Sequence, residues 1–284
     1  MKTGLKATYI NPLTDFGFKK LFGDENNKEL LADFLSEIIA EEGRITEINY
    51  LPPEKLGRTE DDRRAVFDIY CKNERGEYFI VEMQKAKQLH FVDRSVFYAT
   101  FPIQEQAPQG IWNFELKAVY LVGILDFDYF DGDDYIERVY LAREKTHERF
   151  SNKLNFTYVI LPKFKKTIDE LSSNSDRWLF CLKRMAEMDS RPAEVQGRVF
   201  ERLFKAAEIN KLKDEEMREY NKSILEYADV RDCADCARQE GMQQGIQQGV
   251  FAVAKKLNAS GVAVELIASV TGLSAEQVSR LPRD

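Results

Sequence analysis

Two strongly apolar runs in this chain each carry an acid where a strand core would call for another hydrophobic residue. The first run is AVFDIYC (65–71), with Asp68 at its centre, and the second is YFIVEMQ (78–84), which contains Glu82. Burying a carboxylate costs several kcal/mol unless another group compensates its charge. Either both acids face water, or they lie where a cation binds.

The pattern of apolar residues predicts an α/β domain followed by helices. A short and a longer helix are expected within residues 11–43, and another over 88–106. Strands are expected over 44–51, 65–71, 78–84, 116–127, 134–143 and 155–164. The expected parts are an α/β domain over 1–165, a helical extension over 166–237, and a glycine- and glutamine-rich helical tail with a small helix-turn-helix-like end over 238–284.

Asp68 and Glu82 are 14 residues apart along the chain. Because strand side chains alternate between faces, a hairpin with its turn within 73–76 places both acids near each other on one face. Two neighbouring carboxylates offer the oxygen ligands that Mg²⁺ prefers. The alternative is that both acids are solvated on an open sheet face and paired with Arg63 or Lys85.

An ordered series of segments resembles one nuclease family. The segments are TDFGFKKLFG (14–23), NKELLADFLSEII (27–39), DIYCKNERGEYFIVEMQ (68–84), RSVFYAT (94–100) and LKAVYLVGILDF (116–127). In this order they look like the PD-(D/E)xK family nuclease/transposase group that is related to recombination-promoting nucleases. The resemblance covers about residues 9–127, and QEGMQQGIQQG (239–249) and IASVTGLSAEQVSRL (267–281) also look like that group.

The resemblance implies a restriction-endonuclease-like core, a central mixed sheet flanked by helices, and a metal-dependent DNA endonuclease that uses Mg²⁺ or Mn²⁺. Asp68 and Glu82 match its metal-binding acids, and the carbonyl of Met83 is the expected third metal contact. Gln84 stands where the parent motif has lysine. Because glutamine neither carries a charge nor gives up a proton, it can only orient water or a phosphate, and the general base has no assigned side chain. The alternative is a non-catalytic module of mobile-element origin that binds DNA or another protein through its helical tail.

Five further residues are candidates for supplementary or DNA-contacting roles. Asp15 matches the acid before FGFKKLF, but it also suits the N-cap of that helix. Glu29 matches a supplementary acid found in some relatives of the fold, although a first-turn acid also stabilises a helix dipole. Lys19 either contacts phosphate or is solvated. Arg94 and Tyr98 share a helix face and either border the cleft, with Arg94 on a phosphate, or are a surface arginine and a core tyrosine.

Composition and charge exclude several classes of protein. The net charge of −7 is no nucleic-acid footprint by itself, although residues 18–20, 84–94 and 162–166 are locally basic. There is no apolar run long enough for a membrane span, and no glycine-rich phosphate loop for a nucleotide cofactor. Four cysteines in this length do not form a disulfide framework, and we expect a cytoplasmic location.

The tail combines a glycine stripe with a short helical pair. Gly241, Gly245 and Gly249 recur every four residues, which favours either close backbone packing or a weakly helical linker. Beyond them, Gly272 suits the end of one helix, and Ser274 begins a capping box for the next. The segment favours a packing or oligomerisation unit over a sequence-reading module, so the C-terminal helices are where we expect any homo-oligomer contact.

Overall fold

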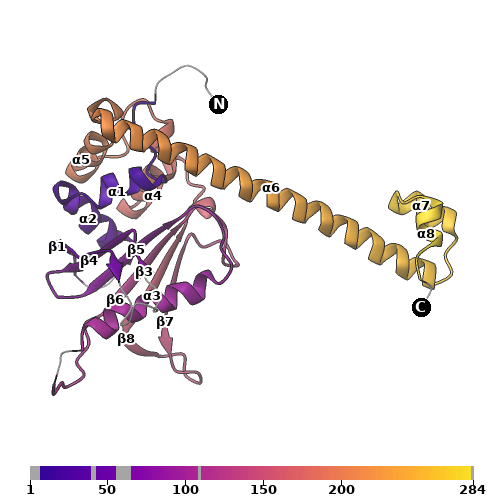
Figure 1. Ribbon diagram of the computed structural model, residues 1–284, viewed down its shortest axis with the longest axis horizontal. Coiled ribbons are helices and arrows are strands. Elements are labelled where there is room, and N and C mark those ends of the chain that lie inside the picture. Colours follow the sequence, from indigo (N-terminus) through magenta and orange to yellow (C-terminus); the bar gives the residue numbers. More distant parts are fainter. Residues whose placement is uncertain (1–6, 40–42, 56–64, 108–109, 283–284) are drawn as a thin grey trace. The chain divides into compact units, whose positions relative to one another are not determined.

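A mixed six-stranded sheet is the centre of the structure, a computed structural model that describes residues 7–39, 43–55, 65–107 and 110–282. The strands follow the order β1-β4-β5-β6-β8-β7, as Figure 1 shows. Their bounds are β1 Ile48–Tyr50, β4 Ile69–Asn73, β5 Tyr78–Gln84, β6 Val119–Leu125, β7 Ile136–Ala142 and β8 Arg149–Ile160. The central strands β5, β6 and β8 run parallel, and the other neighbours pair antiparallel.

Helices cover both faces of the sheet. The helices on one face are α1 Asp15–Phe22, α2 Lys28–Ile39, α4 Asn174–Arg184 and α5 Arg198–Ala207. Their apolar side chains form one core with Phe79 and Val81 of β5. On the other face, α3 (Phe91–Glu105) packs in a second core with Ile80 and Tyr70. This coverage explains why every residue of β6 is buried, as expected for a parallel strand between two helical layers.

Several short elements connect these layers. A two-stranded sheet pairs β2 (Glu54–Lys55) with β3 (Ala65–Val66). The 3-10 turns are Glu25–Asn27, Leu161–Lys163, Ile168–Glu170, Met185–Glu187 and Ile209–Lys211. The expected strand over 44–51 is wrong in its first part, because only Ile48–Tyr50 pairs with β4.

The expected continuous strand over 65–71 is also wrong, because the chain changes sheets within it. Val66 pairs with β2, whereas Ile69 pairs with Val81 of β5. Phe67 and Tyr70 are three residues apart yet join the same core, which strict strand alternation does not allow. Asp68 therefore lies in a bend between β3 and β4 and belongs to neither strand.

The chain divides into two compact units, Met1–Val230 and Arg231–Asp284. Residues 166–230 share the first unit with the sheet, where Trp178, Phe200 and Tyr220 belong to the core beside α1 and α2. A long helix, α6 (Asp214–Ala259), begins in the first unit and continues into the second. The expected division of the chain at residues 165 and 237 remains a prediction.

The second unit has a small core of its own. Two helices, α7 (Val264–Thr271) and α8 (Ala275–Ser279), bury Ile267 and Val278 against Ala254 of α6. The expected ends are confirmed: Gly272 closes α7 with a left-handed φ of 73°, and Ser274 and Gln277 form the capping box of α8. In the described part of the chain, no helix combines the length and apolar composition needed to cross a membrane.

Candidate active site

The two acids of the apolar runs meet at one end of β5. The antiparallel register that pairs Ile69 with Val81 sets Asp68 opposite Glu82. The backbone N–H of Asp68 donates to Glu82 Oε1 at 3.3 Å, and the backbone N–H of Met83 donates to Asp68 Oδ2 at 2.8 Å. These reciprocal bonds hold the carboxylates side by side, as the hairpin argument predicts, although Asp68 reaches this position from a bend and not from a strand.

The electrostatics of the pair show that two negative charges are unfavourable there. Burial, and secondarily the charge of Asp68, raises the pKa of Glu82 from its ordinary 4.5 to about 8, and Arg94 opposes the shift. Burial likewise raises the pKa of Asp68, against the N–H of Met83 and the charge of Lys19. Without a cation, the pair therefore holds a proton near neutral pH.

The donor set fits a hard divalent cation. Two converging carboxylates with raised pKa values gain from a cation that neutralises both, and Mg²⁺ needs only one or two protein carboxylates because it retains waters. In the described residues there is no group of three or more His, Cys, Asp and Glu side chains that could hold a metal. Any metal at Asp68 and Glu82 must therefore take further ligands from the backbone, an amide or water. The carbonyl of Met83 remains the predicted third contact.

Helix α3 brings an arginine and a tyrosine to the pair. Gln84 Nε2 donates to Glu82 Oε2 at 3.3 Å, and Arg94 Nη2 donates to Gln84 Oε1 at 2.7 Å. The Arg94 guanidinium lies 5.7 Å from the centre of the Tyr98 ring. Burial and then the charge of Glu82 raise the pKa of Tyr98, and this ring packs on Phe67, the residue before Asp68, with 5.2 Å between the ring centres. The structure therefore supports the interpretation of Arg94 and Tyr98 as neighbours of the site.

Helix α1 approaches Asp68 with a charged pair of its own. Lys19 lies 2.9 Å from Asp15, and the two act on the Asp68 carboxyl in opposite directions, with Lys19 lowering its pKa and Asp15 raising it. The N-cap interpretation of Asp15 is wrong, because Thr14 is the cap and accepts from the backbone N–H of Gly17 at 3.0 Å. Asp15 is instead the first residue of α1, from which its charge acts on the Asp68 carboxyl.

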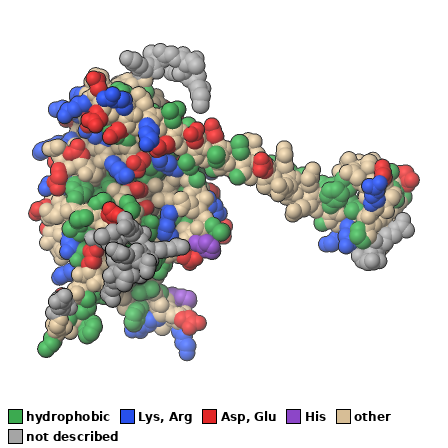
Figure 2. Space-filling view, in the orientation of Figure 1, with side chains coloured by type: hydrophobic (Ala, Val, Ile, Leu, Met, Phe, Trp, Pro, Cys, Tyr) green, Lys and Arg blue, Asp and Glu red, His purple; other side chains and the backbone are tan. Residues whose placement is uncertain are grey.

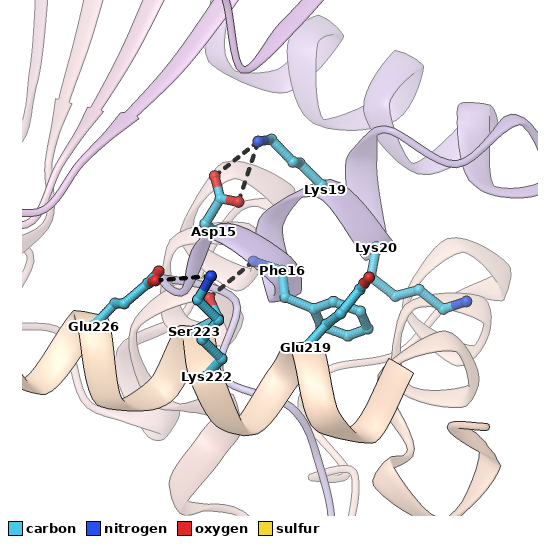
Figure 3. A pocket seen from close by; sticks show the side chains of 8 residues that line it. All are labelled: Asp15, Phe16, Lys19, Lys20, Glu219, Lys222, Ser223 and Glu226. Atoms are coloured by element: carbon cyan, nitrogen blue, oxygen red, sulfur yellow. Dashed lines mark hydrogen bonds and ion pairs between the residues drawn. The ribbon is translucent and has the colours of Figure 1, made fainter. Parts of the chain in front are cut away.

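A cavity of about 420 Å³ lies between α1 and the part of α6 in the first unit. Figure 3 shows Asp15 and Lys19 on one side of this cavity, and Ser223 accepting the N–H of Phe16 at 3.0 Å on the other. Lys222 and Glu226 lie next to Ser223 on α6. Sequence reasoning missed these α6 residues, because nothing in a helical pattern some 200 residues downstream indicates that it packs on α1.

The structure does not bring together all the residues that the sequence suggested for the site. Glu29 pairs with Arg202 of α5 and lines another pocket, so the structure gives it a partner other than Asp68 and Glu82. Of the two suggested partners of the acids, Lys85 acts through its charge to lower the pKa of Asp68, whereas Arg63 lies outside the described residues.

A comparison of the sequence with models of protein families shows which family the chain belongs to. The family model described as PD-(D/E)XK nuclease family transposase matches residues 12–237. The chain belongs to this family. No curated protein and no solved structure matches the chain. The mixed sheet flanked by helices fits the restriction-endonuclease-like fold of PD-(D/E)XK proteins, so the expected fold class is confirmed, and membership supports a function of the nuclease and transposase type.

Proposed function

We propose that this PD-(D/E)XK protein is a metal-dependent DNA endonuclease of the transposase or recombination-promoting type, which hydrolyses phosphodiester bonds with Mg²⁺ or Mn²⁺. The observation that carries the proposal is the pair itself: Asp68 and Glu82 hold each other through backbone bonds, and both have raised pKa values. Acids solvated on an open face would show no such shift. Strongly perturbed carboxyl groups of this kind concentrate at functional sites.

Each residue of the site has a distinct role in the proposal. Asp68 and Glu82 would bind the cation, with the carbonyl of Met83 as a third ligand. When bound, the cation supplies positive charge to a phosphate and acidifies water. Further charges act on the pair from the two flanking helices. They belong to Asp15 and Lys19 of α1 and to Arg94 of α3.

Gln84 is held in one orientation, which suits a positioning role. Its amide oxygen accepts from Arg94, and one N–H points to Glu82. An amide nitrogen carries two N–H groups, so the second one can donate to a water or a phosphate oxygen. Arg94 lies beside the Tyr98 ring and donates to Gln88 as well as Gln84, and its guanidinium has further N–H groups that can donate to the phosphate itself.

The test is cleavage of supercoiled plasmid by the purified protein. We expect nicking or linearisation with Mg²⁺ or Mn²⁺ and none with EDTA. Asp68→Ala and Glu82→Ala should abolish cleavage and should also remove the Mg²⁺ signal in calorimetric titration, because each removes a metal ligand. Glu144→Ala, an exposed acid in the β7–β8 hairpin, is the matched control and should cleave like wild type.

Two further variants separate the role of the amide from that of the metal. Gln84→Ala should slow cleavage less than Asp68→Ala, because a hydrogen bond is lost but both carboxylates remain. Gln84→Lys should be tolerated if this position assists water or phosphate as lysine does in the parent motif. Equal cleavage by wild type and Asp68→Ala would refute the assignment. A wild type that binds neither metal, with or without DNA, would leave the non-catalytic binding module as the remaining function.

A further inference from the structure

A second pocket, away from the paired acids, lies on the outer side of α5. It has a volume of about 620 Å³ and is lined by residues of α5, of the connection between α1 and α2, of the first turn of α2 and of the 3-10 turn Ile209–Lys211. Four of its lining residues are cations and two are acids. The cations are Arg198, Arg202, Lys205 and Lys211, and the acids are Glu29 and Glu201. We refer to this cavity as the α5 pocket.

The amphipathic character of α5 produces this arrangement. Phe200, Leu203 and Phe204 are buried in the core, so residues at the opposite positions of the helix face outward. Arg198 and Lys205 are exposed on that outer side, two turns apart. Figure 2 shows Lys and Arg side chains gathered with Asp and Glu side chains over the end of the first unit that carries α5 in Figure 1.

The cations of the pocket differ in whether they are already neutralised. Arg202 pairs with Glu29, and Lys211 lies 2.9 Å from Glu208. Among the residues that the structure describes, neither Arg198 nor Lys205 forms an ion pair or a side-chain hydrogen bond. A concave surface with cations that remain unpaired favours an anionic ligand, because the ligand replaces water without breaking an existing ion pair.

The α5 pocket adjoins the surroundings of the proposed cleavage site through α1. Lys19 lowers the pKa of Asp68 through its charge. The next residue, Lys20, lines the cavity of Figure 3. The side chain of Asn27, which lines the α5 pocket, donates to the backbone carbonyl of Lys20 at 3.0 Å. Asn27 therefore connects the α5 pocket to α1, the helix that lines the cavity of Figure 3.

We propose that the α5 pocket binds the phosphodiester backbone of DNA outside the segment that is cleaved. A duplex has repeated charges along its length, so a strand held at Asp68 and Glu82 can extend across α1 to Arg198 and Lys205. The contacts are to phosphate and carry no sequence preference. The inference rests on the proposed nuclease function for the identity of its ligand.

The experiment measures DNA affinity without cleavage. The full-length protein is titrated in EDTA against a labelled duplex of about 30 base pairs, at salt concentrations from about 50 to 200 mM. Arg198→Gln and Lys205→Gln should each weaken binding and reduce the slope of log affinity against log salt by about 1. Glu201→Gln should do the opposite and tighten binding, because it removes the acid that stands between the two cations along α5. Lys145→Gln, in the exposed β7–β8 hairpin, should change neither quantity.

The outcomes separate this inference from the proposed function. A wild type that binds the duplex, with unchanged slopes in both cation variants, overturns the α5 pocket and leaves the nuclease proposal standing. A wild type that binds no duplex at any salt concentration overturns both. The opposite sign expected for Glu201→Gln guards against a general loss of folding, which would weaken binding in all three variants. A second duplex of unrelated sequence should give the same changes, and a sequence-dependent effect would contradict phosphate contacts.

Discussion

Replacing Glu82 with glutamine should stabilise the metal-free protein at alkaline pH. In the folded protein the pKa of this carboxyl is raised from 4.5 to about 8, mainly by burial. Between these values the folded protein holds a proton that the unfolded chain has released. The free energy of unfolding therefore falls by about 1.4 kcal/mol per pH unit as the pH rises through this window. The stability is greatest below the pKa of the unfolded chain, where the carboxyl is protonated in both states.

The structure sets the size of the effect. A shift of the pKa from 4.5 to about 8 lowers the free energy of unfolding at pH 8.5 by at most about 5 kcal/mol. Local relaxation and entry of water reduce this to about 2–3 kcal/mol. Glutamine keeps the shape and one oxygen acceptor for the N–H of Asp68, and it sacrifices only the weak 3.3 Å bond from Gln84. Glu82→Gln should therefore be neutral or slightly destabilising at pH 5 and stabilising by about 2 kcal/mol at pH 8.5.

Urea unfolding followed by circular dichroism, in EDTA at pH 5 and pH 8.5, measures this difference. Glu144→Gln, at an exposed position, is the control and should give the same change in unfolding free energy at both pH values. Adding Mg²⁺ at pH 8.5 should stabilise the wild type and have much less effect on Glu82→Gln. An identical effect of Glu82→Gln at the two pH values would refute the reasoning, because the carboxyl would then be titrating normally.

Three further predictions concern the scaffold around the site. Trp178→Phe should lower the free energy of unfolding by about 1–3 kcal/mol in urea titration, because the buried Asp33 loses the indole N–H that donates to it at 2.8 Å. Gly123→Ala should cost about 1–3 kcal/mol in the same assay, since its new Cβ would lie 2.9 Å from the Tyr158 ring; an unchanged midpoint would show that the ring moves freely. Deleting residues 238–284 should leave a cooperative thermal transition, because the last core residue of the first unit precedes the cut; a broad, non-cooperative transition would show that the tail belongs to that core.

Local sequence patterns were sufficient for much of the fold. The spacing of apolar residues within 28–39 and 78–84 predicts which faces are buried, and both elements are found as expected. The continuous apolar run 116–127 predicts a buried strand, which is found over the shorter range 119–125. Asp68 and Glu82 could be paired from sequence because a hairpin relates residues that are close along the chain. One short turn sets the register in which β4 pairs with β5, so the sequence of this hairpin is enough to predict that the two acids meet.

The rest depended on contacts that no local pattern encodes. The bend at Asp68 arises because β3 and β4 pair with different partners, and sequence alternation across 65–71 shows no sign of this change. Thr14, not Asp15, caps α1, and the choice between two adjacent good cap residues follows from how the helix enters the core.

Sequence alone determined which chemical groups this protein can bring to a site: two acids and an amide on the two arms of one hairpin. Only the tertiary structure decided what surrounds them. Arg94 reaches Gln84 because α3 packs on one face of the sheet, and Lys19 influences Asp68 because α1 packs on the other. The physical reason is that burial and charge interactions depend on distance in space, and distance between remote segments is set by how the layers pack.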